Sequence, residues 1–498
     1  MASSVFADRT KGQLLRHIAG GATIYSVVVV LSRVGGFLLL PIYWRFLTPA
    51  DFGIVGIVGL TQGFLVPLLG LGLHDAVQRY YPEWTENQRR ERLGSIWFGI
   101  VAWSLPVCLL LTLGNKVFNL VFESVDSIPY FVIGIWTAFF TSLSALPLSV
   151  LRIRGEVKRF SYASGGIFLT QSITSALLVT VYSMGAAGYL WGGLIGAVLW
   201  AVGLSVAYWR DAAVSWQARN LRELIAYGLP MVPATILDGT ISLFDRYFLD
   251  KQVPLPAIGF YNVANQFGSV VVVVNQGLKS AWIPFLYRIM HDRKDAPAIV
   301  GLFSLYYVAL LVPPALLVAL LSREVLAVFG ERYLESYSYV PWLVLTVYLQ
   351  SVTTAMGRGL DLAKRNGLWP AISAAQVAAS LAALSFLVPA YGAIGAAWSV
   401  AIAAGVRAVV QIAAAHLVYP RPFYGCRLLA LWSIGLLTFW AGTYSRLDSV
   451  ALSAVSKVAV VVVGSLVMVA VVLDRTAMDD LRTLIGSKRT KRMEKAIE

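Results

Sequence analysis

The chain has 498 residues, of which 58% are hydrophobic and 13% charged, and its mean hydropathy is +0.71. This composition excludes an ordinary soluble domain, in which about a quarter of the residues are charged. The net charge of +14 also suits a nucleic-acid-binding protein, but the basic residues are dispersed over short loops, so no nucleic-acid partner is expected.

Apolar stretches long enough to cross a membrane follow one another along the whole chain. A hydrocarbon core roughly 30 Å thick requires about 20 mostly apolar residues per helix. The sequence therefore predicts an all-α integral membrane protein with about fourteen transmembrane helices. In chain order we expect them at about 22–44, 52–73, 94–114, 128–150, 161–183, 188–208, 224–248, 257–284, 298–321, 338–357, 369–389, 392–415, 428–445 and 450–473.

The distribution of basic residues predicts which loops face the cytoplasm. With a cytoplasmic N-terminus, 29 of the 40 Lys and Arg residues fall on that side, 6 on the opposite side and 5 inside helices. Cytoplasmic loops carry such an excess, so both termini are expected in the cytoplasm and the protein in the cytoplasmic (inner) membrane. The first 22 residues are charged and lack a cleavage site, which disfavours a cleaved signal peptide.

A weak internal repeat with an offset of 206 residues indicates two related halves. This shift places Leu15–Arg16 on Leu221–Arg222 and residues 52–54 on 258–260. Because the offset spans six helices, an even number, both copies should have the same orientation in the membrane. The predicted organisation is a cytoplasmic N-terminus (1–21), an N-lobe (22–208), a cytoplasmic linker (209–223), a C-lobe (224–415), a terminal helix pair (428–473) and a basic cytoplasmic tail (474–498).

Motifs of several enzyme classes are missing from the sequence. It contains no Gly-Lys-Ser/Thr phosphate loop, no His-Glu-x-x-His motif and no Gly-x-Ser-x-Gly motif. Cys108 lies in an apolar stretch and Cys426 in a basic loop, so the two cysteines predict neither a disulfide framework nor a metal cluster. We therefore expect a transporter that is not an enzyme and binds no metal or cofactor.

Charged residues within the predicted helices are candidates for function, because a charge at the bilayer centre costs about 3 kcal/mol on insertion scales. Arg33 lies about 11 residues, or roughly 16 Å, from either end of its helix, so it either contacts substrate in a wet cavity or pairs with an acidic residue. Asp238, at the matching position of the C-lobe, is either a proton or sodium site or the counter-ion of Arg33. Asp245 is followed by Arg246, so a structural salt bridge competes with an ion-coupling role.

Two further basic residues, Arg407 and Lys279, either line a cavity or extend to the cytoplasmic interface. Lys457, in the terminal pair, is a weaker candidate. Against two aspartates, the five basic residues within helices predict a net cationic interior. Such an interior suits an anionic cargo, because guanidinium groups bind diphosphate oxygens through two parallel hydrogen bonds.

Aromatic residues make up 12% of the chain, and most are expected at the membrane interfaces or in packing. Some lie within helices together with amide side chains, which bind sugars by stacking and hydrogen bonds. The candidates for a sugar path are Tyr25, Tyr227, Tyr261, Asn265 and Gln276.

Several strings, in order along the chain, resemble the Wzx-like polysaccharide transporters of the multidrug/oligosaccharidyl-lipid/polysaccharide flippase superfamily. They are LSRVGGF at 31–37, RFLTPADFGI at 45–54, YGLP at 227–230, FDR at 244–246, IGFYNVA at 258–264 and FGERY at 329–333. The resemblance implies two lobes around a cationic cavity and alternating access. By the same resemblance, Arg33 matches an arginine that holds the diphosphate of a lipid-linked precursor.

The function implied by this resemblance is to flip a polyprenyl-diphosphate-linked oligosaccharide, such as an O-antigen, capsule or exopolysaccharide unit, to the outer leaflet. Its partners would be this glycan lipid, membrane lipid, and the polysaccharide polymerase and glycosyltransferases, and the transporter would be a monomer. A multidrug extruder of the same superfamily is the alternative, although it needs acidic groups for cationic drugs. A membrane-embedded glycosyltransferase or polymerase would require a larger extramembrane loop than the roughly 20 residues available here.

Overall fold

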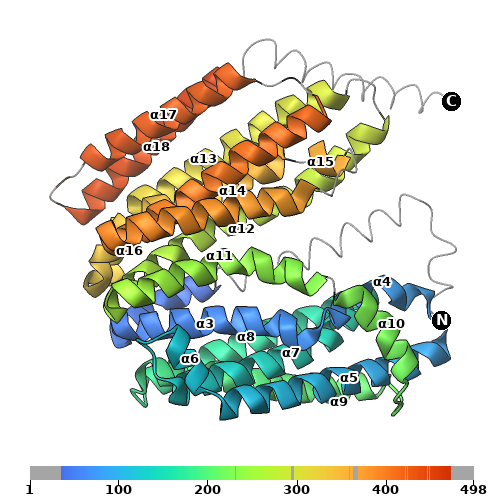
Figure 1. Ribbon diagram of the computed structural model, residues 1–498. Helices are drawn as coiled ribbons and strands as arrows, with labels where there is room; N and C mark the ends of the chain where they lie inside the picture. The colour runs from blue at the N-terminus through green and yellow to red at the C-terminus, as the bar shows by residue number, and fades with distance from the viewer. Residues whose placement is uncertain are drawn as a thin grey trace. The chain divides into compact units, whose positions relative to one another are not determined.

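In the computed structural model, the described residues are 35–229, 231–292, 296–357, 359–362, 368–420, 422, 424–445, 447 and 449–472. Their regular secondary structure is entirely helical (Figure 1). Residues 35–46 form the described part of the first helix. The other helices are α3 (Pro49–Gly70), α4 (Leu73–Tyr80), α5 (Glu86–Leu113), α6 (Lys116–Val121), α7 (Val132–Ile153), α8 (Val157–Thr180), α9 (Gly185–Trp209), α10 (Ala218–Gly228), α11 (Met231–Gln252), α12 (Leu255–Asp292), α13 (Ala296–Phe329), α14 (Val340–Met356), α15 (Gly359–Leu362), α16 (Trp369–Val418), α17 (Gly425–Tyr444) and α18 (Val450–Val472), with short turns η1 (Tyr81–Glu83), η2 (Ser127–Phe131) and η3 (Glu331–Ser338).

The number of helices agrees with the prediction. Within the described residues, ten helices are long and apolar enough to cross a membrane. One of them, α16, turns at Gly392, whose φ of 62° and ψ of −137° are non-helical, so it contains two of the predicted helices. Residues 35–46, α11 and α14 supply the remaining three. An all-α membrane protein of about fourteen helices is thereby confirmed.

Several helix boundaries differ from those predicted. α5 begins before its apolar stretch, at a capping box in which the Thr85 side chain and Gln88 satisfy backbone N–H groups. α13 continues past residue 321, which brings Glu324 into the helix. α10 occupies part of the predicted linker and the start of the predicted seventh helix. Hydropathy misplaces these ends because polar residues can extend a helix beyond its apolar part.

The turn between α3 and α4 depends on Gly72. Its φ of 64° is in the left-handed region, and a Cβ at this position would lie 2.3 Å from the carbonyl oxygen of Gly228. Glycine alone allows both this φ and so close an approach of two backbones. The turn ends the second predicted helix and directs α4 against α10.

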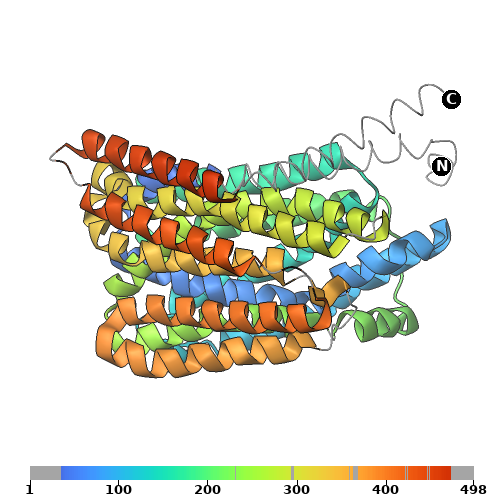
Figure 2. The same ribbon diagram turned by 90° about the horizontal axis from the view of Figure 1, so that it is seen from above.

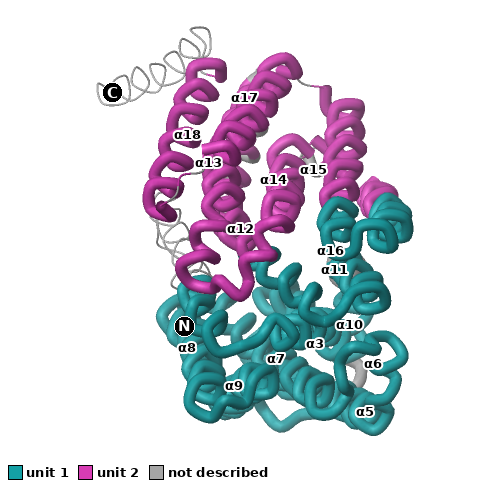
Figure 3. The backbone as a smooth tube through the Cα atoms, turned by 90° about the vertical axis from the view of Figure 1, so that its left-hand side faces the viewer, with its two compact units in different colours: residues 1–266, 377–400 teal, residues 267–376, 401–498 magenta. Residues whose placement is uncertain are grey.

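The chain divides into two compact units, which Figure 3 distinguishes by colour. Unit 1 comprises residues 1–266 and 377–400, and unit 2 comprises residues 267–376 and 401–498. The boundaries fall within the long helices α12 and α16 rather than in loops. The lobes predicted at 22–208 and 224–415 follow a different division of the chain and stay a prediction.

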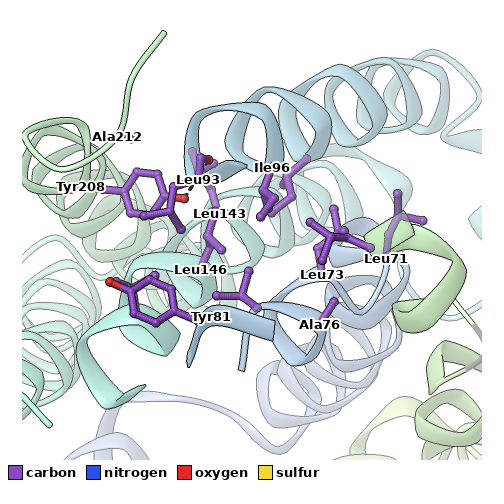
Figure 4. Close-up of a cluster of buried hydrophobic side chains, with 14 of the residues drawn as sticks. Leu71, Leu73, Ala76, Tyr81, Leu93, Ile96, Leu143, Leu146, Tyr208 and Ala212 are labelled. Atoms are coloured by element: carbon purple, nitrogen blue, oxygen red, sulfur yellow. Dashed lines mark hydrogen bonds between the residues drawn. The ribbon is translucent and has the colours of Figure 1, made fainter. Parts of the chain in front are cut away.

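The core of unit 1 includes a buried apolar cluster that joins α4, α5, α7, α9 and α10 (Figure 4). Leu93, Ile96 and Leu146 are fully buried within it. The hydroxyl group of Tyr208 donates to the carbonyl oxygen of Leu93 at 2.8 Å, which satisfies the polar end of this buried aromatic side chain. The cluster fixes the ends of five helices against one another.

A second set of contacts in unit 1 connects the end of α11 to the segment that follows α6. The Asp250 carboxylate, 8% exposed, accepts hydrogen bonds from the backbone N–H groups of Glu123 (2.6 Å) and Ser124 (3.2 Å), and from the Ser124 hydroxyl. The neighbouring Lys251 forms an ion pair with Glu123. These contacts join segments more than 120 residues apart in the sequence.

Close backbone packing also joins α3 to the first turns of α12. A Cβ at Gly259 would lie 1.7 Å from the carbonyl oxygen of Pro49 and 3.2 Å from the backbone nitrogen of Gly53. The side-chain amide of Asn262 donates to the carbonyl oxygen of Phe52 at 3.0 Å. The two strings that the 206-residue offset aligns, 52–54 and 258–260, therefore contact each other in unit 1.

In unit 2, α13 packs against α14, α17 and α18. α17 and α18 lie side by side in Figures 1 and 2. Small residues permit this packing, since a Cβ at Gly464 would lie 2.2 Å from the Thr438 hydroxyl and one at Gly442 would lie 2.5 Å from Leu320. The terminal helix pair is thus packed directly onto α13.

Candidate functional site

Three of the predicted site residues cannot be placed from their side chains. Arg33 and Tyr25 lie outside the described residues. Asp238 lies on α11, but its side chain is not among those described. The roles assigned to these three residues stay predictions.

Asp245 and Tyr261, two predicted site residues, are in direct contact in a buried cluster of α11 and α12. Tyr261 donates its hydroxyl hydrogen to Oδ2 of Asp245 at 3.0 Å, and the Arg246 guanidinium lies 3.3 Å from the same oxygen. The guanidinium carbon is also 4.4 Å from the centre of the Tyr261 ring. All three residues are at most 5% exposed.

The surroundings of Asp245 offset part of the cost of burying its charge. A buried carboxylate without partners would cost several kcal/mol, and the Arg246 cation and the Tyr261 hydroxyl donor reduce that cost. The cation–π contact with the Tyr261 ring in turn stabilises the buried Arg246. The sequence suggested the pair of Asp245 with Arg246 from their adjacency. It gave no sign of the Tyr261 contact, because the two side chains meet only once α11 and α12 pack.

Arg407 is half-buried on α16, where Nη1 donates to Oε1 of Gln376 at 2.8 Å. Gln376 is 2% exposed and precedes the turn at Gly392, whereas Arg407 follows it. A neutral amide orients the guanidinium without cancelling its charge. Arg407 therefore remains a cation available to an anion, and Gln376 is a positioning residue that the sequence did not indicate.

The other predicted cavity residues have varied surroundings. On α12, Lys279 is half-buried, whereas Asn265 and Gln276 are exposed. Tyr227, on α10, packs edge to face against Tyr80, with ring centroids 5.3 Å apart. Their roles in binding sugar or diphosphate stay predictions.

The charge balance predicted for the helices omitted Glu324. Lys457 of α18 donates to Oε1 of Glu324 at 2.5 Å and to the carbonyl oxygen of Leu320 at 3.0 Å. The Ser453 hydroxyl donates to the same carboxylate oxygen at 2.9 Å. Both charged side chains are buried, so Lys457 forms a structural ion pair between α13 and α18. The predicted end of the ninth helix at 321 placed Glu324 in a loop.

A cavity of about 610 Å³ lies in unit 1 among residues 36–43, α3, α7, α8 and α9. Eleven of its 21 lining residues carry a hydroxyl, amide or indole N–H group, and none of the lining side chains described is charged. Tyr43 and Tyr189 meet edge to face in its wall, with ring centroids 5.1 Å apart. These residues form no local motif, since they come from five helices, so the sequence did not indicate the cavity.

An apolar groove of about 480 Å³ lies in unit 2 among α13, α14 and α17. Its walls consist mainly of Leu, Val and Ala side chains with Trp342, Trp432 and Phe439. The indole N–H of Trp432 donates to the Tyr348 hydroxyl oxygen at 3.0 Å, so the polar ends of these two rings are paired. The groove can hold a hydrocarbon chain but offers little to a charged ligand.

Residues 42–338 match the model of a protein family described as polysaccharide biosynthesis protein. The chain belongs to this family. The match extends from the first described helix to η3 and includes most of the strings that suggested a polysaccharide transporter. The resemblance predicted from the sequence is therefore confirmed.

Two curated relatives are similar to this member of the polysaccharide biosynthesis protein family. A protein of the Lsg locus of Haemophilus influenzae is 22% identical over 367 residues, which cover 66% of this chain and 83% of the relative. The succinoglycan biosynthesis transport protein ExoT of Rhizobium meliloti is 22% identical over 333 residues, which cover 64% of each chain. The chain thus aligns with just under two thirds of ExoT.

Solved structures of transporters share the fold. The lipid II flippase MurJ in an inward closed conformation has a TM-score of 0.73 at 14% identity, with 90% of this chain and 99% of MurJ covered. An inward-facing multidrug resistance transporter of the MATE family has a TM-score of 0.55 at 16% identity, with 82% of this chain and 96% of the transporter covered. At these identities the likeness concerns the fold, which is that of a multi-pass membrane transporter.

Proposed function

We propose that the protein is a flippase that moves a polyprenyl-diphosphate-linked oligosaccharide from the cytoplasmic to the outer leaflet. The observation that carries the proposal is membership in the polysaccharide biosynthesis family over residues 42–338. Loops of at most roughly 20 residues favour transport over synthesis, which would require a larger extramembrane loop. The fold shared with a protein named as a lipid II flippase supports a lipid-linked cargo.

The diphosphate of the cargo requires basic groups away from bulk water. In our proposal Arg33, Arg407 and Lys279 supply them, and Gln376 holds Arg407 in place at 2.8 Å. Arginine suits this task because its planar group forms two parallel hydrogen bonds to phosphate oxygens.

The polyprenyl chain requires an apolar surface. The groove among α13, α14 and α17 has such a surface and a volume of about 480 Å³, and exposed side chains of Trp342, Leu345 and Leu436 border it. A chain of this chemistry would gain from leaving water but would not need hydrogen-bond partners.

The two lobes would alternate between inward- and outward-open states around the cargo. Asp238 and Asp245 would bind a coupling ion or act as counter-ions, and Asp245 already has Arg246 as a partner. Parts of the sugar path would come from Tyr25, Tyr227, Tyr261, Asn265 and Gln276.

The same proposal implies where the protein acts and with which partners. The transporter would be a non-enzymatic monomer of the cytoplasmic membrane with both termini in the cytoplasm. It would receive its cargo from glycosyltransferases and deliver it to a polysaccharide polymerase.

A deletion strain tests the proposed function. We expect lipid-linked repeat units to accumulate in the inner leaflet and surface polysaccharide to disappear, and the intact gene to reverse both effects. Drug hypersensitivity with normal polysaccharide would instead identify an extruder like the MATE transporters. Unextended sugar lipid on the outer leaflet would identify a polymerase.

A further inference from the structure

The cavity of unit 1 has the chemical character of a binding site for a neutral, polar ligand. Its volume of about 610 Å³ is within the range of small-molecule sites, which is roughly 300–1,000 Å³. Like most such sites it has a mainly apolar surface, and half of the lining residues also carry a hydroxyl, amide or indole group. Serine and threonine are common in helix packing within membranes, so the lining is distinguished by its amides (Gln62, Gln171), its tyrosine hydroxyls (Tyr43, Tyr189) and the Trp200 indole.

Some of these polar groups are already paired within the protein, and the pairing fixes the aromatic walls. The Tyr43 hydroxyl donates to the carbonyl oxygen of Ser172 at 3.3 Å, and the Trp200 indole N–H donates to the Thr170 hydroxyl at 3.0 Å. Tyr43 is also held by the edge of the Tyr189 ring. The aromatic faces are therefore rigid surfaces rather than mobile side chains.

Other polar groups of the lining are available to a ligand. Within the described part of the chain, the Gln62 amide and the Tyr189 hydroxyl make no hydrogen bond. The Thr141 side chain is exposed although the helix around it, α7, is mostly buried, because Thr141 borders the cavity. Gln62 and Thr141 come from α3 and α7, and Tyr189 comes from α9, so these groups surround the cavity rather than line one wall.

The kind of ligand follows from what the lining offers. A cationic drug would require a carboxylate and a diphosphate would require a cation, and the described lining side chains contain neither. A hydrocarbon chain would bury the amide and hydroxyl groups without replacing their hydrogen bonds to water. A sugar unit has hydroxyl groups that pair with amides and hydroxyls, and a C–H face that packs on aromatic rings.

We propose that this cavity binds an uncharged sugar unit of the cargo. The proposal rests on the proposed function and deepens it, because it assigns glycan recognition to helices of unit 1 and separates it from the binding of the diphosphate and the polyprenyl chain. A site that must hydrogen-bond hydroxyl groups discriminates against lipids that lack them, since its polar groups would then remain unpaired.

Gly193 offers a direct way to fill the cavity. It lies in the lining on α9, and a Cβ added there would have no neighbour within 4 Å. Gly203 is a matched control, because it lies on the same helix, does not line the cavity and also has open space at its Cβ. Gly193→Trp should therefore block the cavity, while Gly203→Trp adds the same side chain elsewhere.

The experiment measures binding to the purified transporter in lipid nanodiscs. One probe is the lipid-linked oligosaccharide extracted from the deletion strain, and the other is undecaprenyl diphosphate without sugar. We expect Gly193→Trp to weaken binding of the oligosaccharide lipid by about tenfold or more and to leave binding of undecaprenyl diphosphate within about twofold. Tyr189→Phe removes only one hydroxyl group and should weaken binding of the oligosaccharide lipid by about threefold to tenfold. Gly203→Trp should change neither.

Each outcome has a distinct meaning. Three outcomes would overturn the cavity as a sugar site and leave the proposed function intact. They are an equal loss of binding for both probes, an equal loss of binding in the two Trp variants, and unchanged binding in both Gly193→Trp and Tyr189→Phe. A wild-type protein that does not bind the oligosaccharide lipid would overturn the proposed function and this site with it. Tyr189→Phe keeps the test valid if Gly193→Trp does not fold.

Discussion

The buried ion pair of Lys457 and Glu324 joins residues that lie far apart in the sequence. Lys457 and Glu324 are 133 residues apart and form an ion pair between α18 and α13, with Ser453 donating to the same carboxylate. The desolvation of two such groups offsets much of their attraction. The pair therefore specifies where the terminal helices dock more than it adds to stability.

This view of the ion pair leads to a prediction for stability. Lys457→Met or Glu324→Leu alone should lower stability by about 3–5 kcal/mol, because each leaves an unpaired buried charge. The double variant should recover most of this loss, since neither charge remains. Thermal unfolding of the purified protein in detergent measures the effect. A double variant as unstable as the sum of the single variants would show that the contact itself, rather than the unpaired charge, governs stability.

A second prediction concerns the side chain of Arg33. If it binds the diphosphate near mid-membrane, Arg33→Ala should abolish surface polysaccharide while the amount of membrane-inserted protein stays nearly normal. Arg33→Lys should restore part of the activity, because an ammonium keeps the charge but loses the planar group. If Arg33 instead pairs with Asp238, Arg33→Ala should reduce folded protein, and Arg33→Ala with Asp238→Ala should restore it. Normal polysaccharide in Arg33→Ala would exclude a role in binding the cargo.

The charged side chains could be identified from the sequence, whereas their partners could not, apart from the adjacent pair Asp245 and Arg246. A charge in an apolar stretch is visible in the local sequence, as Arg407 and Lys457 show. Gln376 comes next to Arg407, and Glu324 next to Lys457, only when the helices pack together. The cavity of unit 1 illustrates the same limit. Gln62 and Tyr189 are ordinary polar residues in their own helices, and their common function emerges from the packing of five helices.

The close contact of α3 with α12 involves residues that the 206-residue offset aligns. Gly53 and Gly259 occupy equivalent positions in the two copies, and the backbone atoms there approach within distances that only glycine allows. Two copies related by an axis along the membrane normal would meet at that axis, where side chains from both copies compete for space. The aligned strings meet in unit 1 where α3 contacts α12, and the repeat itself stays a prediction.

The contacts at the end of α11 lead to a prediction for hydrogen exchange. Asp250→Ala removes the acceptor for the backbone N–H groups of Glu123 and Ser124, so these amides should exchange with deuterium at least about tenfold faster. Lys251→Ala is the matched control. Its ion pair with Glu123 is at the surface, where such pairs contribute little, so exchange should change by less than about threefold. Similar exchange in both variants would mean that Asp250 does not hold the segment after α6.

The existence and order of the helices were predictable, whereas their ends were not. Each apolar stretch was long enough to identify, including the two helices of α16 on either side of Gly392. The ends depend on caps and tertiary contacts, such as the capping box at Thr85 and the close approach of Gly72 to Gly228. Helices in polar sequence, such as α10, give no hydropathy signal.

For the whole molecule, the number of helices determines the orientation of every loop. With fourteen helices the termini lie on the same side, and each inserted or deleted helix would invert all loops that follow it. The structure supports fourteen because α11 and α14 add to the ten long apolar helices, although α11 is less apolar and α14 is shorter than those. The turn in α16 divides that element into two of the predicted helices. The side on which the termini lie depends on the basic residues alone, which makes it a separate prediction.

Reporter fusions decide this orientation. A reporter that is active only outside the cytoplasm should be active after Asp126, Lys251 or Ser336 and inactive after Arg90 or Arg159. The physical reason is that basic loops resist translocation, and 29 of the 40 basic residues belong to loops on one side in this arrangement. Fusions to a reporter active only in the cytoplasm are the control and should give the opposite pattern. Inversion at all five sites would place the termini outside, and the proposed direction of transport would then lose its support. Inversion at only some sites would contradict the count of fourteen helices and locate the error between the last agreeing site and the first inverted one.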